Sequence, residues 1–336
     1  MKKIFVTGGA GFIGSALIRH LIRHTNHKII CVDKITYAGN LNSLKEVIKN
    51  KNFKFEKVNI CNSKKVNKLL SKYKPEIIFH LAAESHVDNS IMKPSIFINT
   101  NIIGTYNLLN ETQFFLNKLK LNDKKKFRFI HISTDEVYGD LGFNAKASKE
   151  NSPYAPSSPY SASKASSDHL VKAWIRTYKF PGIITNCSNN YGPHQNKEKL
   201  IPMIISKLLK KEKIPIYGNG QQIRDWIYVD DHIRALYLIA TKGRLGESYN
   251  IGGGNQIKNI DMVKKIYERI SNFNKYKSIK LEDYKSLITF VKDRAGHDYR
   301  YDIDCSKLKR NLKWRKEETL NSGLLKTIDW YLKSYS

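Results

Sequence analysis

Two groups of side chains in the middle of the chain have the types and spacing that acid–base chemistry needs. Tyr160 and Lys164 are four residues apart, which places both on one face of a helix. An ammonium beside a phenol favours the phenolate, so the pair predicts a tyrosine with a lowered pKa that acts as a general base. Asp135 and Glu136 are adjacent carboxyls after an apolar run, where one can take a proton and the other give one. The alternatives are chance helical spacing for the first pair and a solvated acidic loop for the second.

A glycine-rich segment near the N-terminus has the spacing of a dinucleotide-phosphate loop. Gly8, Gly11 and Gly14 connect an apolar run to an amphipathic segment. Glycines so spaced allow a tight turn and a close approach to a pyrophosphate, which then faces the free N–H groups of a helix start. Asp33 lies about 20 residues beyond, where a carboxylate binds a ribose 2′-hydroxyl and repels a 2′-phosphate. The segment therefore predicts NAD rather than NADP, although the adjacent Lys34 leaves that preference open, and a plain glycine turn is the alternative.

The elements that must position these residues alternate between short β-branched runs and amphipathic segments. Strands are predicted at residues 3–6, 28–32, 77–81 and 128–132, with helices at residues 14–24 and 94–116. Such alternation implies an α/β fold with a Rossmann-type, doubly wound parallel sheet and right-handed crossovers. Because ligands bind at the carboxyl ends of parallel strands, Ser133, Thr134 and the two carboxyls are expected in the ligand crevice.

The second half of the chain has a mixed pattern. Loops rich in Gly, Pro and aromatic residues separate helices predicted at residues 200–211, 230–241, 260–271 and 323–333. We therefore expect an NAD-binding domain at residues 1–189 and a smaller, mixed α/β substrate-binding region at residues 190–336. The boundary is soft, because a strand predicted at residues 246–251 can return to the main sheet.

Composition narrows the class of protein. With 336 residues, 41% of them hydrophobic, the chain can bury one large α/β core or two medium ones. No run approaches the roughly 20 apolar residues of a membrane-spanning helix. The four cysteines are scattered, with no CxxC pair and no histidine cluster at metal spacing. That pattern favours free thiols in the cytoplasm and predicts neither a metal site nor a membrane partner.

The formal net charge of +28 has two interpretations. It can serve nucleic-acid binding or the attraction of a polyanionic ligand. It can also be a lysine-rich surface without a function, which is favoured because the lysines are spread along the whole chain. We therefore predict no nucleic-acid partner.

Together these motifs resemble the extended short-chain dehydrogenase/reductase family. The resemblance implies that Tyr160 removes the proton of a sugar hydroxyl while NAD takes the hydride. It also implies that Lys164 holds the nicotinamide ribose and that Thr134 orients the hydroxyl. The segment Thr134-Asp135-Glu136 discriminates within the family: epimerases typically carry small or uncharged residues at the last two positions, and decarboxylases carry Thr-Ser-Glu. Paired carboxyls indicate the elimination of water, with Glu136 taking a proton from C5 of the sugar and Asp135 protonating the C6 hydroxyl.

Longer segments resemble the nucleotide-sugar 4,6-dehydratases of that family over nearly the full length. The matching segments are residues 33–40, 81–88, 154–159, 186–193, 198–202, 224–226 and 293–298. The resemblance implies dTDP-glucose as the substrate, a 4-keto-6-deoxy sugar for deoxysugar synthesis of the dTDP-rhamnose type as the product, and a homodimer formed through residues 95–116 and 160–178. A UDP-sugar 4,6-dehydratase, an NDP-sugar 4-epimerase and a non-catalytic NAD-binding protein stay open as alternatives.

The same resemblance assigns binding residues. The cofactor contacts that it implies are Gly8, Gly11, Phe12, Ile13, Gly14, Asp33, Lys34, Thr36, Gly39, Asn59, Ile60, Leu81, Ala82, Ala83, Ser85, Thr100, Tyr160, Lys164 and Asn190. The substrate contacts that it implies are Ser85, His86, Thr134, Asn189, Lys199, Leu200, Pro215, Tyr217, Arg224, Asn259, Arg294 and His297. The two arginines suit pyrophosphate oxygens by their fork geometry, with salt-bridge residues as the alternative. Asn59 departs from the family, which usually has an aspartate there.

Overall fold

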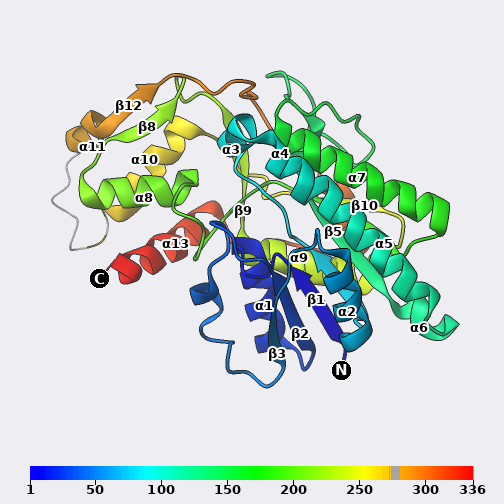
Figure 1. Cartoon of the computed structure of the whole chain (residues 1–336). Helices are drawn as coiled ribbons and strands as arrows, with labels where there is room; N and C mark the ends of the chain where they lie inside the picture. Colours follow the sequence, from blue (N-terminus) through cyan, green and yellow to red (C-terminus); the bar gives the residue numbers. More distant parts are fainter. Residues whose placement is uncertain (272, 274–280, 336) are drawn as a thin grey trace.

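A parallel sheet with helices on both faces forms the larger part of the molecule (Figure 1). The computed structural model describes residues 1–271, 273 and 281–335. All seven strands of the sheet are parallel, in the order β10-β6-β5-β4-β1-β2-β3. Their bounds are β1 (Lys3–Thr7), β2 (Lys28–Asp33), β3 (Phe53–Lys57), β4 (Ile77–His80), β5 (Arg128–Thr134), β6 (Gly182–Cys187) and β10 (Ser248–Ile251). The Rossmann-type prediction is confirmed.

Two helical layers bury the faces of this sheet. Apolar side chains of α1 (Phe12–His24) and α9 (Val229–Lys242) pack on one face. Side chains of α2 (Ser63–Tyr73), α5 (Gly104–Asn117) and α7 (Pro159–Tyr178) pack on the other. The single helix predicted at residues 94–116 is instead α4 (Pro94–Phe97), a π-helical segment η2 (Ile98–Ile103) and α5. Wide π turns often mark functional sites.

A second, smaller body of structure carries its own hydrophobic core. It contains two small sheets, β11-β9-β7 and β12-β8. Its elements are β7 (Asn189–Tyr191), α8 (Leu200–Lys210), β8 (Ile214–Tyr217), β9 (Ile223–Tyr228), β11 (Gln256–Lys258), α10 (Asn259–Ile270), α11 (Leu281–Leu287), β12 (Ile288–Val291) and α13 (Leu320–Tyr335). The helices expected at residues 200–211, 260–271 and 323–333 are α8, α10 and part of α13.

Some late segments return to the larger body. The strand expected at residues 246–251 is β10, which pairs with β6, and the helix expected at residues 230–241 is α9. The division at residues 189 and 190 stays a prediction. The remaining short elements are η1 (Leu41–Leu44), α3 (Val87–Met92), α6 (Leu121–Lys126), η3 (Asp135–Tyr138) and α12 (Ser306–Leu312).

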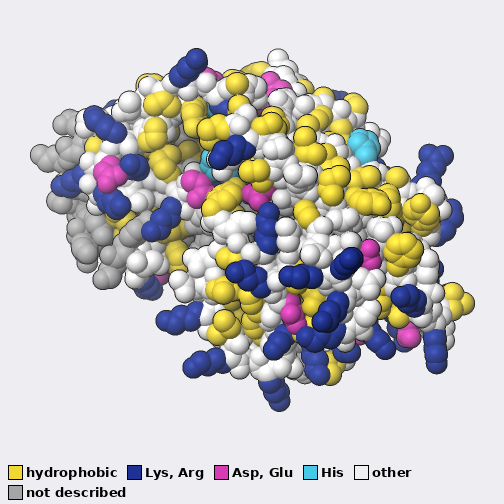
Figure 2. Space-filling view, viewed as in Figure 1, with side chains coloured by type: hydrophobic (Ala, Val, Ile, Leu, Met, Phe, Trp, Pro, Cys, Tyr) yellow, Lys and Arg dark blue, Asp and Glu magenta, His cyan; other side chains and the backbone are white. Residues whose placement is uncertain are grey.

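In the part of the chain that the structure describes, no helix combines the length and apolar composition that crossing a bilayer requires. Lysine and arginine side chains are scattered over the face shown in Figure 2.

Candidate active site

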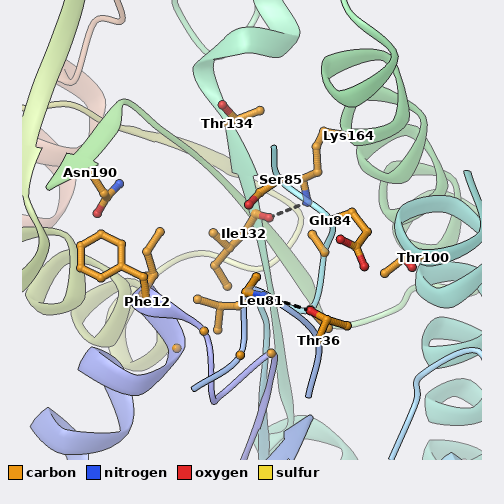
Figure 3. A pocket seen from close by; sticks show the side chains of 18 of the residues that line it. Phe12, Thr36, Leu81, Glu84, Ser85, Thr100, Ile132, Thr134, Lys164 and Asn190 are labelled. Carbon is orange, nitrogen blue, oxygen red and sulfur yellow. Dashed lines mark hydrogen bonds between the residues drawn. The ribbon is translucent and has the colours of Figure 1, made fainter. Parts of the chain in front are cut away.

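One elongated pocket follows the carboxyl ends of the sheet. Segments after six neighbouring strands contribute to it: Gly8 after β1, Asp33 at the end of β2, Asn59 after β3, Leu81 after β4, Thr134 at the end of β5 and Cys187 at the end of β6. All of the residues predicted to contact the cofactor line this pocket. Figure 3 shows Phe12 and Asn190 on one side of it, with Glu84 and Thr100 on the other.

The glycines fit a dinucleotide pyrophosphate. Gly8 has a φ of +69°, and a Cβ added there would lie 2.6 Å from the backbone nitrogen of Ala82. A Cβ on Gly14 would lie 2.2 Å from the carbonyl oxygen of Gly8, so the first turn of α1 packs directly on the loop. No side chain caps the start of α1 at Gly11, which leaves the N–H groups of the first turn available to phosphates. The loop is therefore suited to hold the pyrophosphate of a dinucleotide.

The end of β2 suits an unphosphorylated ribose. The Asp33 carboxylate accepts hydrogen bonds from the backbone N–H groups of Ala10 at 3.0 Å and Ile35 at 2.7 Å, which fix its position. The ammonium of Lys34 turns away to Glu84, with Nζ 3.1 Å from Oε1, and also donates to Thr100 Oγ1 at 3.2 Å. Because Lys34 is already held in an ion pair, it is poorly placed to neutralise a 2′-phosphate.

The Tyr160–Lys164 pair lies at the inner end of the pocket, on the first turns of α7. A capping box of Ser158 and Ser161 fixes the start of this helix. Lys164 Nζ donates to the carbonyl oxygen of Ile132 at 2.8 Å (Figure 3). Burial raises the pKa of Tyr160 well above its usual value, and the nearby Glu136 raises it further, against a hydrogen bond with Thr134 that lowers it.

The lowered pKa that the helical spacing predicts for Tyr160 is therefore not found: its pKa is raised, and Lys164 is not among the main groups that shift it. Helical spacing places the two residues on one face, but the ammonium bonds to a strand carbonyl, and burial of the phenol dominates.

The two neighbouring carboxyls have different environments. Asp135 is 2% exposed, and its Oδ1 accepts a hydrogen bond from Thr134 Oγ1 at 3.2 Å, whereas its buried Oδ2 has no hydrogen-bond partner among the described residues. Burial, reinforced by Glu136, raises the pKa of Asp135 well above its usual value. Burial also raises the pKa of Glu136, but the positive charges of Arg224, Lys199 and Arg294 oppose that increase. Asp135 is therefore suited to carry a proton and Glu136 to accept one.

A stability measurement checks the environment of Asp135. A carboxyl with a raised pKa contributes stability that is fully present below its usual pKa of 3.8 and is lost as the pH rises through the raised value. At neutral pH, ionisation of the buried Asp135 carboxyl therefore costs folding free energy. Asp135→Asn removes that cost, so it is expected to increase the free energy of unfolding by about 1 kcal/mol or more at neutral pH. The gain should be larger at a pH of about 8 than at about 5 in thermal unfolding. An equal gain at both pH values would contradict a raised pKa.

A buried polar cluster between α7 and β5 was not predicted. The Asp168 carboxylate accepts hydrogen bonds from Ser133 Oγ at 2.8 Å and Tyr154 OH at 3.0 Å, and its Oδ1 lies 3.0 Å from His131 Nε2. These contacts tie the helix that carries Tyr160 to β5. They hold the pKa of Asp168 below its usual value despite burial.

A second pocket opens beside the first, between α3 and the smaller body. Except for Thr134, which lines the inner pocket, every residue predicted to contact the substrate lines this cleft. Residues shared by both pockets are Ser85, Glu136, Asn189, Asn190, Gln195 and Lys199. A ligand in the cleft therefore reaches Glu136, next to the inner pocket with Tyr160 and Asp135. Roles in catalysis and binding stay predictions for all of these residues.

The two arginines of the cleft differ in their partners. Arg224 donates to the backbone carbonyls of Ile223, Asp298 and Tyr299. Arg294 forms the ion pair that sequence reasoning left open as an alternative, with Asp88 as its partner. Sequence reasoning also missed Gln195, Glu198, Asp298 and Tyr301, which line the cleft. Asp88, Glu198 and Asp298 stand inside the segments that carried the family resemblance, and this resemblance was the signal that could have found them.

This arrangement, a seven-stranded parallel sheet with a pocket at its carboxyl ends and a second cleft beside that pocket, defines the class: an extended short-chain dehydrogenase/reductase. Comparison with known proteins specifies the family. The chain belongs to the GDP-mannose 4,6 dehydratase family, whose sequence model matches residues 5–327.

Relatives and solved structures agree with this assignment. The dTDP-glucose 4,6-dehydratase of Neisseria meningitidis serogroup B is 54% identical over 332 residues, which cover 99% of this chain and 94% of the relative. An Escherichia coli dTDP-glucose 4,6-dehydratase is 54% identical over 340 residues, covering 99% and 94%. Among solved structures, the dTDP-glucose 4,6-dehydratase of Streptomyces venezuelae, with NAD bound, has a TM-score of 0.88 and 38% identity and covers 98% of this chain and 97% of its own.

Proposed function

We propose that this chain is an NAD-dependent dTDP-glucose 4,6-dehydratase, a hydro-lyase that forms dTDP-4-keto-6-deoxyglucose and water for deoxysugar synthesis. The observation that carries the proposal is the pair of adjacent carboxyls Asp135 and Glu136, which line the same pocket as Tyr160 and Lys164. Relatives with this activity by name are 54% identical over 99% of the chain.

The first step is oxidation at C4 of the hexose. When bound, NAD supplies a hydride acceptor at C4 and later returns the hydride to C6, and its oxidised ring carries a positive charge that favours a phenolate. Tyr160 takes the proton of the 4-hydroxyl, and Thr134, at the end of β5, orients that hydroxyl. Lys164, held on the carbonyl of Ile132, lies where it can contact the nicotinamide ribose. Gly8, Gly11 and Gly14 hold the pyrophosphate of the dinucleotide.

The second step is the loss of water across C5 and C6. The new 4-keto group acidifies the C5 proton, which Glu136 removes. Asp135, whose pKa is raised by burial and by Glu136, gives its proton to the C6 hydroxyl, and water leaves to form an enone. After hydride reaches C6, Glu136 returns a proton to C5. Tyr160 now holds the proton of the 4-hydroxyl and Asp135 has lost one. The transfer of one proton from Tyr160 to Asp135 through solvent restores both groups, so the net change in the sugar is the loss of one water.

The epimerase alternative is not distinguished by the fold. UDP-glucose 4-epimerase of Thermotoga maritima has a TM-score of 0.86 to this chain at 28% identity, covering 99% of this chain and all of its own. Epimerisation needs only the oxidation at C4 and its reversal. The buried proton donor at Asp135 has a use only in dehydration.

Mass spectrometry of the product tests the proposal. Purified protein loaded with NAD is incubated with dTDP-glucose and, separately, with UDP-glucose. We expect the dTDP-sugar to lose the mass of one water, with much slower turnover of the UDP-sugar. Faster turnover of UDP-glucose would overturn the choice of nucleobase, and a product of unchanged mass would favour the epimerase.

A homodimer is part of the proposal. Apolar side chains gather on the face over α4, η2 and α5 in Figure 2. The exposed apolar residues of these elements include Ile96, Ile103, Tyr106 and Phe114. A patch of this kind is typical of a protein interface, and a second copy of the chain is the occupant that the family resemblance implies. Sedimentation of the purified protein is expected to give a dimer. A monomer across the micromolar range would contradict it. A cytoplasmic location is also proposed, because the four cysteines are free.

A further inference from the structure

Arg294, one of the cations of the substrate cleft, is bound by a carboxylate of the larger body. Its Nε lies 2.5 Å from Asp88 Oδ1 and its Nη2 lies 3.0 Å from Asp88 Oδ2. Tyr217 OH donates to the same carboxylate at 3.3 Å, and the guanidinium lies 4.9 Å from the centre of the Tyr217 ring. Asp88 belongs to α3 and Arg294 to the segment after β12, so the pair joins the two sides of the cleft.

Arg224, the other arginine of the cleft, is held differently. Its guanidinium donates to three backbone carbonyls and lies 4.3 Å from the centre of the Tyr301 ring. Those acceptors are neutral carbonyls, and no salt bridge ties Arg224 to a carboxylate among the described residues. The charge of Arg294, in contrast, is balanced by Asp88 at hydrogen-bond distance.

A pyrophosphate in the cleft offers Arg294 the same kind of acceptor that Asp88 offers. Carboxylate and phosphate oxygens both accept two parallel N–H bonds from a guanidinium fork. An arginine already paired with one of them binds the other less tightly, since its charge is neutralised and part of its fork is occupied.

We propose that Asp88 is an affinity-setting residue, which weakens nucleotide-sugar binding by competing with the pyrophosphate for Arg294. The inference rests on the proposed function, because it takes a nucleoside diphosphate sugar as the ligand. Substrate and product carry the same nucleotide, so tighter binding of that part favours both equally and gives no gain in the chemical step. Competition by Asp88 keeps the release of the product fast.

Binding of dTDP, which has the pyrophosphate and lacks the sugar, measures this competition directly. In NAD-loaded protein, Asp88→Asn is expected to lower the dissociation constant for dTDP by about three- to tenfold in calorimetry. Binding of thymidine, which has no phosphate, should not change. In an Arg294→Gln background, Asp88→Asn should give no tightening, because the guanidinium for which Asp88 competes is gone.

Two further variants separate competition from general charge and from misfolding. Glu198→Gln removes one carboxylate from the same cleft without touching the Arg294 pair, and it should tighten dTDP binding less than Asp88→Asn. Asp88→Ser serves as a second uncharged variant if the asparagine unfolds at a lower temperature than the parent.

Unchanged or weaker dTDP binding in folded Asp88 variants would overturn the inference. The proposed function is tested separately. It fails if the parent protein makes no dehydrated product from dTDP-glucose, whatever the ratio of the dTDP dissociation constants of the parent and the Asp88 variants.

Discussion

Asp135→Asn and Glu136→Gln are expected to separate oxidation of the sugar from its dehydration. Either change removes one partner of the proton transfers at C5 and C6 and leaves Tyr160, Thr134 and Lys164 in place. Formation of the 4-keto-6-deoxy product should fall by about 10² to 10⁴, the usual contribution of a positioned acid or base. Reduced nicotinamide should still appear on mixing with dTDP-glucose, because hydride transfer from C4 precedes dehydration. Stopped-flow absorbance and product mass measure the two steps independently.

The control for this pair is Asp123, an exposed carboxyl on α6 that lines neither pocket. Asp123→Asn should dehydrate the sugar at close to the parental rate. If both Asp135→Asn and Glu136→Gln release the dehydrated sugar at the rate of the parent, the assignment of the two carboxyls fails.

Tyr160→Phe is expected to stop the reaction one step earlier. Without the phenol no group at this position takes the proton of the 4-hydroxyl, so both product formation and reduced nicotinamide should fall by about 10² to 10⁴. NAD should stay bound, because the glycine loop, Asp33 and the other residues that line the same pocket are unchanged and only one hydroxyl is removed. Tyr178→Phe, at the exposed end of the same helix, is the matched control and should behave as the parent does. Normal reduction of nicotinamide in Tyr160→Phe would remove Tyr160 from the mechanism.

The main sheet was predictable where its strands are apolar. β1, β2, β4 and β5 are buried β-branched runs, and the sequence places them correctly. β3 was missed because it is an edge strand, in which charged residues alternate with Phe53 and Phe55. β6 was missed because half of its six buried residues are Gly, Thr and Asn, which hides the apolar pattern.

The motifs predicted where the site lies, but they did not predict the hydrogen-bond and ion-pair partners of its residues. Each short motif follows a strand, and parallel strands bring their carboxyl ends to one edge, so the motif residues meet in one pocket. The partner of Lys164 was not predictable, since helical spacing says nothing about the carbonyl of Ile132 on a neighbouring strand. The pairing of Asp88 with Arg294 joins residues 206 positions apart, which no local pattern reveals.

The central claim is that the hydride lost from C4 of the hexose returns to C6 of the same molecule, after Glu136 and Asp135 have removed water. Incubating the protein with dTDP-glucose that carries deuterium at C4 tests it most directly. Mass spectrometry and NMR of the product should find the label at C6 and one water lost. Label that stays at C4, or a dehydrated product with no deuterium at C6, would contradict the account.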